Sequence, residues 1–277
     1  MIPEIALMVE GQDGLNWARW QSIAPVAESA GYVGLYRSDH FTNPQGPYKD
    51  SLECWTSLTW LASHTTRLEF GPLVSPFSFR HPAMLVRMAA AVDDLSDGRL
   101  QFGIGAGWQE REHTNYGYFL GTIPERMARF REGVQIVSHL LRSEQPLTLQ
   151  GKFYQLNDAV LLPRPKRPNG PPVVIGGNGK QFTLALAARY ADEWNATFRT
   201  PEQFQELSAH LDTLLDQAGR PREAVRRTMM ARLDYGDLGK VRADLEALAA
   251  VGVQRVMLQW LELDNVAGIE AMARALV

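Results

Sequence analysis

An acidic residue and a histidine stand side by side at Asp39 and His40, shortly after an apolar, β-prone segment at residues 32–36. An adjacent carboxylate and imidazole can donate and accept protons around a polar ring. The same two residue types also occur as a helix-capping aspartate beside a packed histidine. The pair is therefore a candidate for acid–base chemistry, and its weight depends on where the fold places it.

A glycine-rich segment at residues 176–179 (Gly-Gly-Asn-Gly) could bind a phosphate. It follows the apolar residues 172–175 and precedes a helical segment that begins near Gln181, so its backbone N–H groups and the helix dipole favour an anion. It is not the P-loop of nucleotide hydrolases, because Val174 stands where that motif has its first glycine and Gln181 where it has Ser or Thr.

A second glycine-rich segment ends the apolar residues 100–104 with Gly105, Ala106 and Gly107. The dinucleotide-binding fingerprint would need a third glycine at position 108, which is occupied by Trp108. This departure disfavours an open NAD-binding fold. Glycines at strand ends can be simple turns, yet several of them on one rim would let a flat ligand approach the backbone closely.

Metal and nucleophile chemistry have little support in the sequence. The six histidines include no closely spaced pair of the kind that binds a catalytic metal, so we predict none. Ser38, Ser75 and Cys54 lie in no nucleophile motif. Among the tryptophans, we expect only Trp108 and Trp194 to face a site and the others to pack in the interior.

Composition and charge are those of an ordinary globular protein. Of the 277 residues, 45% are hydrophobic and 21% are charged. The 28 basic and 31 acidic residues give a net charge of -3, so we expect no broad positive surface that would bind nucleic acid. Cys54 is the single cysteine and no basic residue precedes Arg19, so we expect a cytoplasmic protein without an export signal. The most apolar helical stretch, residues 83–92, contains Arg87 and is too short to cross a membrane.

Segments of strand and helix type alternate along the whole chain. The predicted strands are residues 5–9, 32–36, 68–75, 100–104, 172–175, 193–198, 228–233 and 254–260. The predicted helices, the first capped by Asn16, are residues 17–30, 52–65, 81–95, 125–141, 182–190, 201–218, 238–250 and 266–277. Eight such units predict an α/β protein with one domain, residues 1–277, folded as a closed (β/α)8 TIM barrel.

Two insertions exceed ordinary loop length. Residues 108–124 follow the fourth strand and start at the face where barrel enzymes build their active sites, so we expect them to form a lid. Residues 143–170 precede the fifth strand and start from the opposite face. A barrel brings these polar and glycine-rich strand ends to one rim: Glu10, Asp39, His40, Ser75, residues 105–107, residues 176–179 and Asn195.

Short motifs in a fixed order resemble the luciferase-like monooxygenase family. They are residues 38–41 (SDHF), 67–75 (RLEFGPLVS), 79–82 (FRHP), 95–100 (LSDGRL), 103–108 (GIGAGW), 116–117 (YG), 124–126 (PER), 174–177 (VIGG) and 191–195 (ADEWN). The resemblance covers most of the chain and is loose only after Phe198. The Ser-Asp-His-Phe form is similar to the coenzyme F420-dependent branch.

The resemblance implies a deazaflavin ring across the carboxyl ends of the barrel strands. It implies a bulge in the third strand, with a cis peptide not involving proline, at Leu73–Val74. It places Asp39 and His40 beside the ring, with His40 as the proton handler and Asp39 as its partner. The other cofactor contacts that it implies are Leu73, Val74, Gly105, Ala106, Gly107 and Trp108, with Gly176, Gly177 and Asn178 at the phosphate.

One departure from the family pattern concerns the substrate. Relatives that oxidise sugar phosphates carry a glutamate acid where this chain has Trp108, although Glu110 lies two residues later. The resemblance therefore argues against a sugar-phosphate substrate.

The resulting expectation is an oxidoreductase that transfers hydride between coenzyme F420 and a small organic substrate. One alternative is an FMN-dependent monooxygenase of the same family, and another is a non-catalytic barrel that binds flavin or deazaflavin. A third is an unrelated barrel lyase or hydrolase acting on a phosphorylated metabolite. Family relatives often form dimers through barrel helices, and residues 58–61 would either supply an apolar face for a homodimer or pack inside the protein.

Overall fold

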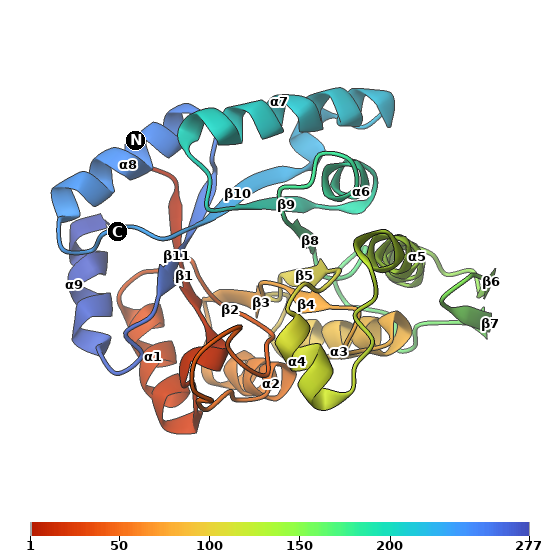
Figure 1. Cartoon of the computed structure of the whole chain (residues 1–277), viewed down its shortest axis with the longest axis horizontal. Coiled ribbons are helices and arrows are strands. Elements are labelled where there is room, and N and C mark those ends of the chain that lie inside the picture. The colour runs from red at the N-terminus through yellow and green to blue at the C-terminus, as the bar shows by residue number, and fades with distance from the viewer. Residues whose placement is uncertain (1, 277) are drawn as a thin grey trace.

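The computed structural model describes residues 2–276, which form a parallel barrel surrounded by helices (Figure 1). The barrel strands are β1 (Glu4–Val9), β2 (Gly34–Arg37), β3 (Glu69–Pro72), β4 (Ser75–Pro76), β5 (Phe102–Gly105), β8 (Val173–Gly176), β9 (Glu193–Thr197), β10 (Arg226–Ala231) and β11 (Arg255–Trp260). Their order is β3-β2-β1-β11-β10-β9-β8-β5-β4, with parallel pairing throughout. The predicted (β/α)8 barrel is confirmed.

The third barrel strand is divided into β3 and β4 by a cis peptide between Leu73 and Val74. The sequence pattern predicts one continuous strand at residues 68–75, and that prediction is wrong because the bulge interrupts the pairing. The cis peptide implied by the family resemblance is present. A bridge between Phe70 and Leu100 brings β3 beside the start of β5 and closes the barrel.

Helices cover the outside of the barrel in alternation with the strands (Figure 1). They are α1 (Trp17–Ser29), α2 (Cys54–His64), α3 (Pro82–Leu95), α5 (Ile123–Arg142), α6 (Thr183–Tyr190), α7 (Pro201–Gln217), α8 (Leu238–Ala250) and α9 (Val266–Leu276). Asn16 caps α1, as predicted, by accepting the Arg19 N–H at 3.2 Å. The two ends of the predicted domain, Met1 and Val277, lie outside the described residues.

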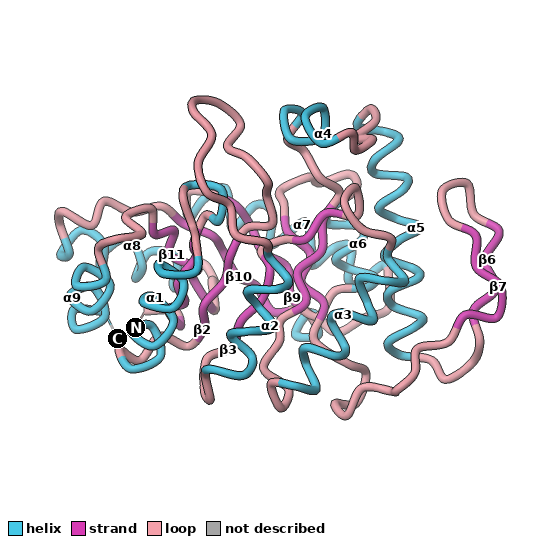
Figure 2. Tube along the Cα trace, turned by 90° about the horizontal axis from the view of Figure 1, so that it is seen from below, coloured by secondary structure: helices cyan, strands magenta, loops and turns pink. Residues whose placement is uncertain are grey.

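The two insertions fold in different places around the barrel. The first contains α4 (Glu110–Tyr116), which lies over the carboxyl ends of the strands, a region that we call the barrel mouth (Figure 2). The second contains an antiparallel hairpin of β6 (Leu147–Gln150) and β7 (Gln155–Ala159), which lies outside α5 (Figure 2). The first insertion therefore has the position expected of a lid.

The barrel interior is filled from its middle to its amino-terminal end. The middle is packed by Ala6, Met8, Tyr36 and Met257. Below this layer the buried Arg255 guanidinium pairs with Glu4 at 2.8 Å and Glu69 at 2.5 Å. The mouth is therefore the end of the barrel where a ligand can meet the strand ends.

Two surface expectations can be compared with the fold. Leu58 and Leu61 on α2 are fully buried in the core, so their side chains pack inside the protein and supply no apolar face to a partner. Among the helices in the described part of the chain, none has the length and apolar content needed to cross a membrane.

Candidate active site

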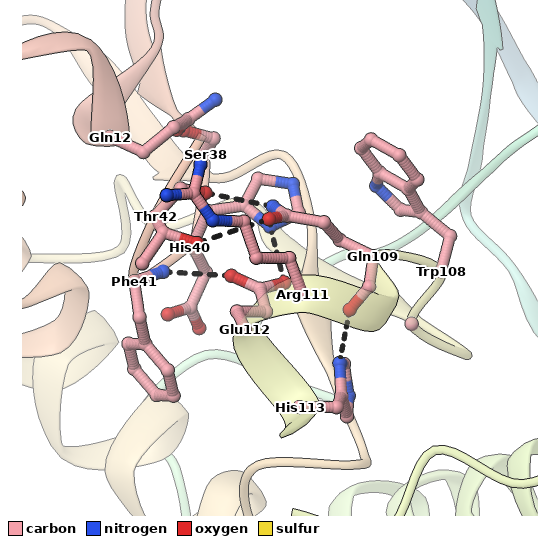
Figure 3. A network of polar contacts seen from close by, with 12 residues as sticks. Gln12, Ser38, His40, Phe41, Thr42, Trp108, Gln109, Arg111, Glu112 and His113 are labelled. Carbon is pink, nitrogen blue, oxygen red and sulfur yellow. Dashed lines mark hydrogen bonds and ion pairs between the residues drawn. The ribbon is translucent and has the colours of Figure 1, made fainter. Parts of the chain in front are cut away.

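Glu112, which the sequence pattern did not single out, holds His40 at the barrel mouth (Figure 3). His40 follows β2, whereas Glu112 lies on α4, 72 residues later. Glu112 Oε1 lies 2.7 Å from His40 Nδ1, and Oε2 accepts the Phe41 N–H at 2.8 Å. Glu112 is only 1% exposed, so its carboxylate joins the lid to the strand end where water competes little.

Gln109, the residue before α4, ties the start of the lid to the segment that follows His40. Its amide nitrogen donates to the Thr42 carbonyl at 2.8 Å and lies 3.3 Å from His40 Nδ1. The Thr42 hydroxyl donates in turn to Gln109 Oε1 at 3.2 Å. Because Nδ1 faces the Glu112 carboxylate, it carries the ring proton of the neutral imidazole, and Nε2 is then the basic nitrogen.

His40 Nε2 is the open nitrogen of this arrangement. Within residues 2–276, Nε2 makes no hydrogen bond. The atom is not fully buried, so solvent can reach it. The side chain is 16% exposed, and the Trp108 ring stands edge-on to the imidazole with centroids 5.5 Å apart. A molecule in the mouth can therefore exchange a proton with Nε2.

The pKa of His40 is raised above the ordinary histidine value. Burial disfavours the charged imidazole, but the hydrogen bond and the charge of Glu112 outweigh burial, with further help from the charges of Glu10 and Asp39. The charged form therefore persists to higher pH than in a free histidine. A partly exposed imidazole held in this way can both donate and accept a proton at its free nitrogen.

Asp39 is not the hydrogen-bonding partner of His40, which corrects the expectation from the sequence. Its carboxylate accepts from Ser75 Oγ and from Arg80 Nη1, both at 2.6 Å, and it is 3% exposed. Asp39 therefore fastens the end of β2 to the third strand, and its contact with a cofactor stays a prediction.

Two strand-end glycines make room for Val74 of the bulge. A Cβ at Gly105 would lie 2.6 Å from Val74 Cγ2, and a Cβ at Gly176 would lie 3.2 Å from Val74 Cγ1. The strands approach the bulge so closely that little space is left for a side chain. Positions 107 and 177 need glycine for a different reason. Their φ angles, 84° and 126°, are positive, and side chains rarely allow such a backbone conformation.

We expect Gly105→Ala to lower the free energy of unfolding by about 1–3 kcal/mol, because the added methyl overpacks against Val74. Urea unfolding of the single variants and of the pair G105A/V74A measures the coupling. Gly105→Ala should lower the free energy of unfolding by less in the Val74→Ala background, where the clashing methyl groups are gone. An equal cost in both backgrounds would show that Val74 is not the reason for glycine at this position.

Residues 176–179 form the turn between β8 and α6, in which the Gly177 N–H donates to the Asn195 carbonyl at 2.9 Å. The Asn178 side chain ties this turn to Thr197, accepting its N–H and donating to its carbonyl, both at 3.0 Å. In the part of the chain that the structure describes, the N–H groups of residues 178–182 donate to no acceptor, and α6 begins without a side-chain cap. Free N–H groups at a helix start fit a phosphate.

Trp194 does not face the mouth, contrary to the prediction. It is fully buried, its ring stacks on Phe204 of α7 with centroids 5.3 Å apart, and its Nε1 donates to the Gly177 carbonyl at 2.9 Å. The neighbouring Asn195 points into the barrel, so Trp194 must point outward. It supports the glycine turn from behind, whereas Trp108 is 60% exposed at the mouth.

A family model described as luciferase-like monooxygenase matches residues 5–251. The chain belongs to the luciferase-like monooxygenase family. This finding confirms the resemblance that the sequence motifs indicate. In this luciferase-like barrel, the Glu112–His40 pair takes the place of the expected pair of Asp39 and His40.

Relatives of this luciferase-like chain include dehydrogenases and monooxygenases. An F420-dependent glucose-6-phosphate dehydrogenase of Microbacterium testaceum is 31% identical over 216 residues, which are 76% of this chain and 62% of that protein. The pyrimidine monooxygenase RutA of Yersinia enterocolitica is 27% identical over 212 residues, covering 72% and 56%. The chain therefore spans about three-fifths of the length of these curated relatives.

Solved structures share the fold over the whole luciferase-like barrel. An F420-dependent secondary alcohol dehydrogenase in complex with an F420-acetone adduct matches with a TM-score of 0.89 and 17% sequence identity. The match covers 100% of this chain and 98% of that one. This likeness establishes the barrel architecture.

Proposed function

We propose that this luciferase-like barrel is an oxidoreductase that transfers hydride between coenzyme F420 and a small organic substrate. The observation that carries the proposal is the His40 imidazole, which Glu112 holds through Nδ1 while Nε2 stays open at the mouth. The relatives support it, since one named as an F420-dependent dehydrogenase is 31% identical and one named as an F420-dependent alcohol dehydrogenase has the same fold.

The cofactor would be held by residues at the bulge and at the glycine turn. The free N–H groups of residues 178–182 would bind its phosphate, and Leu73 and Val74 would lie against its ring. Residues 105–108 would lie along it. When bound, a deazaflavin supplies a hydride carrier. Asp39, tied to Arg80, would keep the end of β2 rigid beside it.

His40 would move the proton that accompanies hydride transfer. An alcohol that becomes a ketone loses a hydride from carbon and a proton from oxygen, and the reverse reaction needs both returned. Neutral Nε2 can accept that proton, and the imidazolium can return it. Glu112 faces Nδ1 and stabilises the charged ring, so we assign it as a positioning residue.

An FMN-dependent monooxygenase is the second candidate function. Relatives named as monooxygenases, at 27% and 29% identity, favour it. A phosphate-bearing flavin would use the same glycine turn and the same bulge as a deazaflavin. The two functions differ in oxygen consumption, which only the monooxygenase requires. A third candidate is a barrel that binds the cofactor without turnover.

A parallel titration with F420 and FMN tests the proposed cofactor. Tryptophan fluorescence reports binding of each cofactor to the same protein, because Trp108 is exposed at the mouth. We expect F420 to bind about tenfold more tightly than FMN or better, a difference of about 1.4 kcal/mol. We also expect no oxygen uptake when the F420-loaded protein oxidises secondary alcohols. Preference for FMN with oxygen uptake would favour the monooxygenase, and binding of neither cofactor would overturn the proposal.

A further inference from the structure

Three polar side chains from neighbouring strands form a chain of contacts at the barrel mouth, from the exposed Arg232 to the buried Gln259 and Glu10. Arg232 Nε donates to Gln259 Oε1 at 2.5 Å, and Gln259 Nε2 donates to Glu10 Oε1 at 2.5 Å. By strand alternation these residues continue the inward-facing sets of β10, β11 and β1. The charge of Glu10 also acts on His40, so this chain of contacts borders the proposed proton-transfer group.

Arg232 carries a positive charge without a counter-ion. Among residues 2–276, no acceptor is bonded to its two terminal nitrogens and no carboxylate pairs with it. Gln259 is a neutral amide, and it separates Arg232 from Glu10, whose oxygens accept from Gln12 and Gln259. A guanidinium fixed at Nε presents its remaining donors as a fork, which matches the two oxygens of a carboxylate.

Phe198 holds the guanidinium from a second side. Its ring centroid lies 5.8 Å from Arg232 Cζ, within the range of a cation–π contact. Phe198 has φ of 49°, a conformation that is uncommon for a bulky residue and that clusters at ligand sites. Its side chain is 44% exposed. The conformation therefore keeps an aromatic ring at the mouth beside the arginine.

A cavity of about 370 Å³ opens next to this arginine, between the ends of β9 and β10 and helix α8. Its apolar walls include Met229, Leu233 and Leu248, and Arg199 supplies a second guanidinium. Asp244 also lines the cavity, but its carboxylate is paired with Lys240 at 2.9 Å. A cavity with apolar walls and cationic groups at one side suits a molecule with an apolar body and an anionic end.

We propose that Arg232 binds a carboxylate of an apolar organic acid, which is the substrate class of this enzyme. The inference rests on the proposed function, which it narrows from small organic molecules to organic acids. The Asn178 side chain ties the phosphate turn to Thr197, the residue before Phe198, so this cavity lies close to the proposed phosphate site. The experiment therefore measures F420 affinity together with the affinity for a small carboxylate.

Hexanoate and hexanamide are suitable probes, because they share length and shape and differ in charge. Calorimetry on the F420-loaded protein should give about tenfold tighter binding of hexanoate than of hexanamide. Arg232→Gln should weaken hexanoate binding by about 10- to 100-fold and leave hexanamide and F420 binding unchanged. Arg232→Lys, which keeps the charge without the fork, should recover part of the affinity. Arg242→Gln removes an exposed arginine of α8 and serves as the matched control.

The outcomes separate this inference from the proposed function. Unchanged hexanoate binding in R232Q, with thermal unfolding as in wild type, overturns the assignment of Arg232. A loss of F420 affinity without a loss of hexanoate affinity also overturns it, because the anion would then belong to the cofactor. If the wild-type protein binds neither F420 nor FMN, the same calorimetry is run on the cofactor-free protein. Hexanoate selectivity that R232Q then loses means that the anion site stands and the proposed function fails.

Discussion

Replacing His40 with glutamine should lower kcat/KM by about 100- to 10,000-fold, the range that a general acid–base group contributes. Glutamine has similar polarity and size but no nitrogen that titrates. The glycine turn and the bulge do not include His40, so the affinity for F420 should stay close to that of wild type. Steady-state kinetics and the cofactor titration together measure both quantities.

His139 offers a matched control for this substitution. It lies on α5, and its Nε2 contacts the Gln145 carbonyl at 2.8 Å on the outside of the barrel. His139→Gln should leave both turnover and F420 affinity unchanged. If His40→Gln binds F420 normally and turns over at the wild-type rate, proton transfer occurs elsewhere and the role given to His40 is wrong.

Glu112→Ala should lower kcat by about 100-fold, because the imidazole and the Phe41 N–H both lose the group that fixes them. KM should change much less, since Glu112 faces Nδ1 and not the open side of the ring. Glu110→Gln is the control, because Glu110 is the exposed acidic residue two positions earlier on α4. If E112A and E110Q behave alike, Glu112 has no positioning role.

Glu112→Gln tests the electrostatic part of that role. In wild type, the Glu112 carboxylate raises the pKa of His40 against the effect of burial. A neutral amide leaves burial dominant, so the pKa of His40 should fall. In the oxidative direction, which needs neutral Nε2, the rate should reach its plateau at lower pH. In the reductive direction, which needs the imidazolium, the rate falls as the pH rises through the pKa of His40, and this fall should begin at a lower pH than in wild type. Profiles that do not move would contradict this role.

The barrel could be predicted because each unit carries a strong local signal. Buried strands such as residues 5–9 are continuous apolar runs, and helix starts carry caps such as Asn16 and Thr200. The division of the third strand at Leu73–Val74 has no such signal, since those residues are as apolar as their neighbours. The family resemblance, rather than residue periodicity, supplied the cis peptide there.

The outward direction of Trp194 follows from the sequence once its strand is assigned. The strand predicted at residues 193–198 is present as Glu193–Thr197, and the Asn195 side chain points into the barrel, where it bonds to Thr228 and Met257. In a strand, Trp194 must then point to the opposite side from Asn195. Asp39 and His40 are adjacent in the chain, yet they bond to different partners, Arg80 and Glu112.

The partnership of Glu112 with His40 could not be read from the sequence. The two residues are 72 positions apart, and Glu112 lies in an insertion whose path over the mouth depends on tertiary packing. A helix of seven residues, Glu110–Tyr116, is too short to show an apolar period. One hint existed, since Gln109, Glu112 and His113 share one helical face and all are buried.

The most direct test of the proposed chemistry is nitrogen NMR of the His40 ring, recorded across pH with and without F420. We expect neutral His40 to carry its proton on Nδ1. Its pKa should lie above the ordinary histidine value and should fall in Glu112→Gln. The Nε2 signal should shift when F420 binds. A ring that carries its proton on Nε2, or that does not respond to bound F420, would contradict the assignment of His40 as the proton-transfer group.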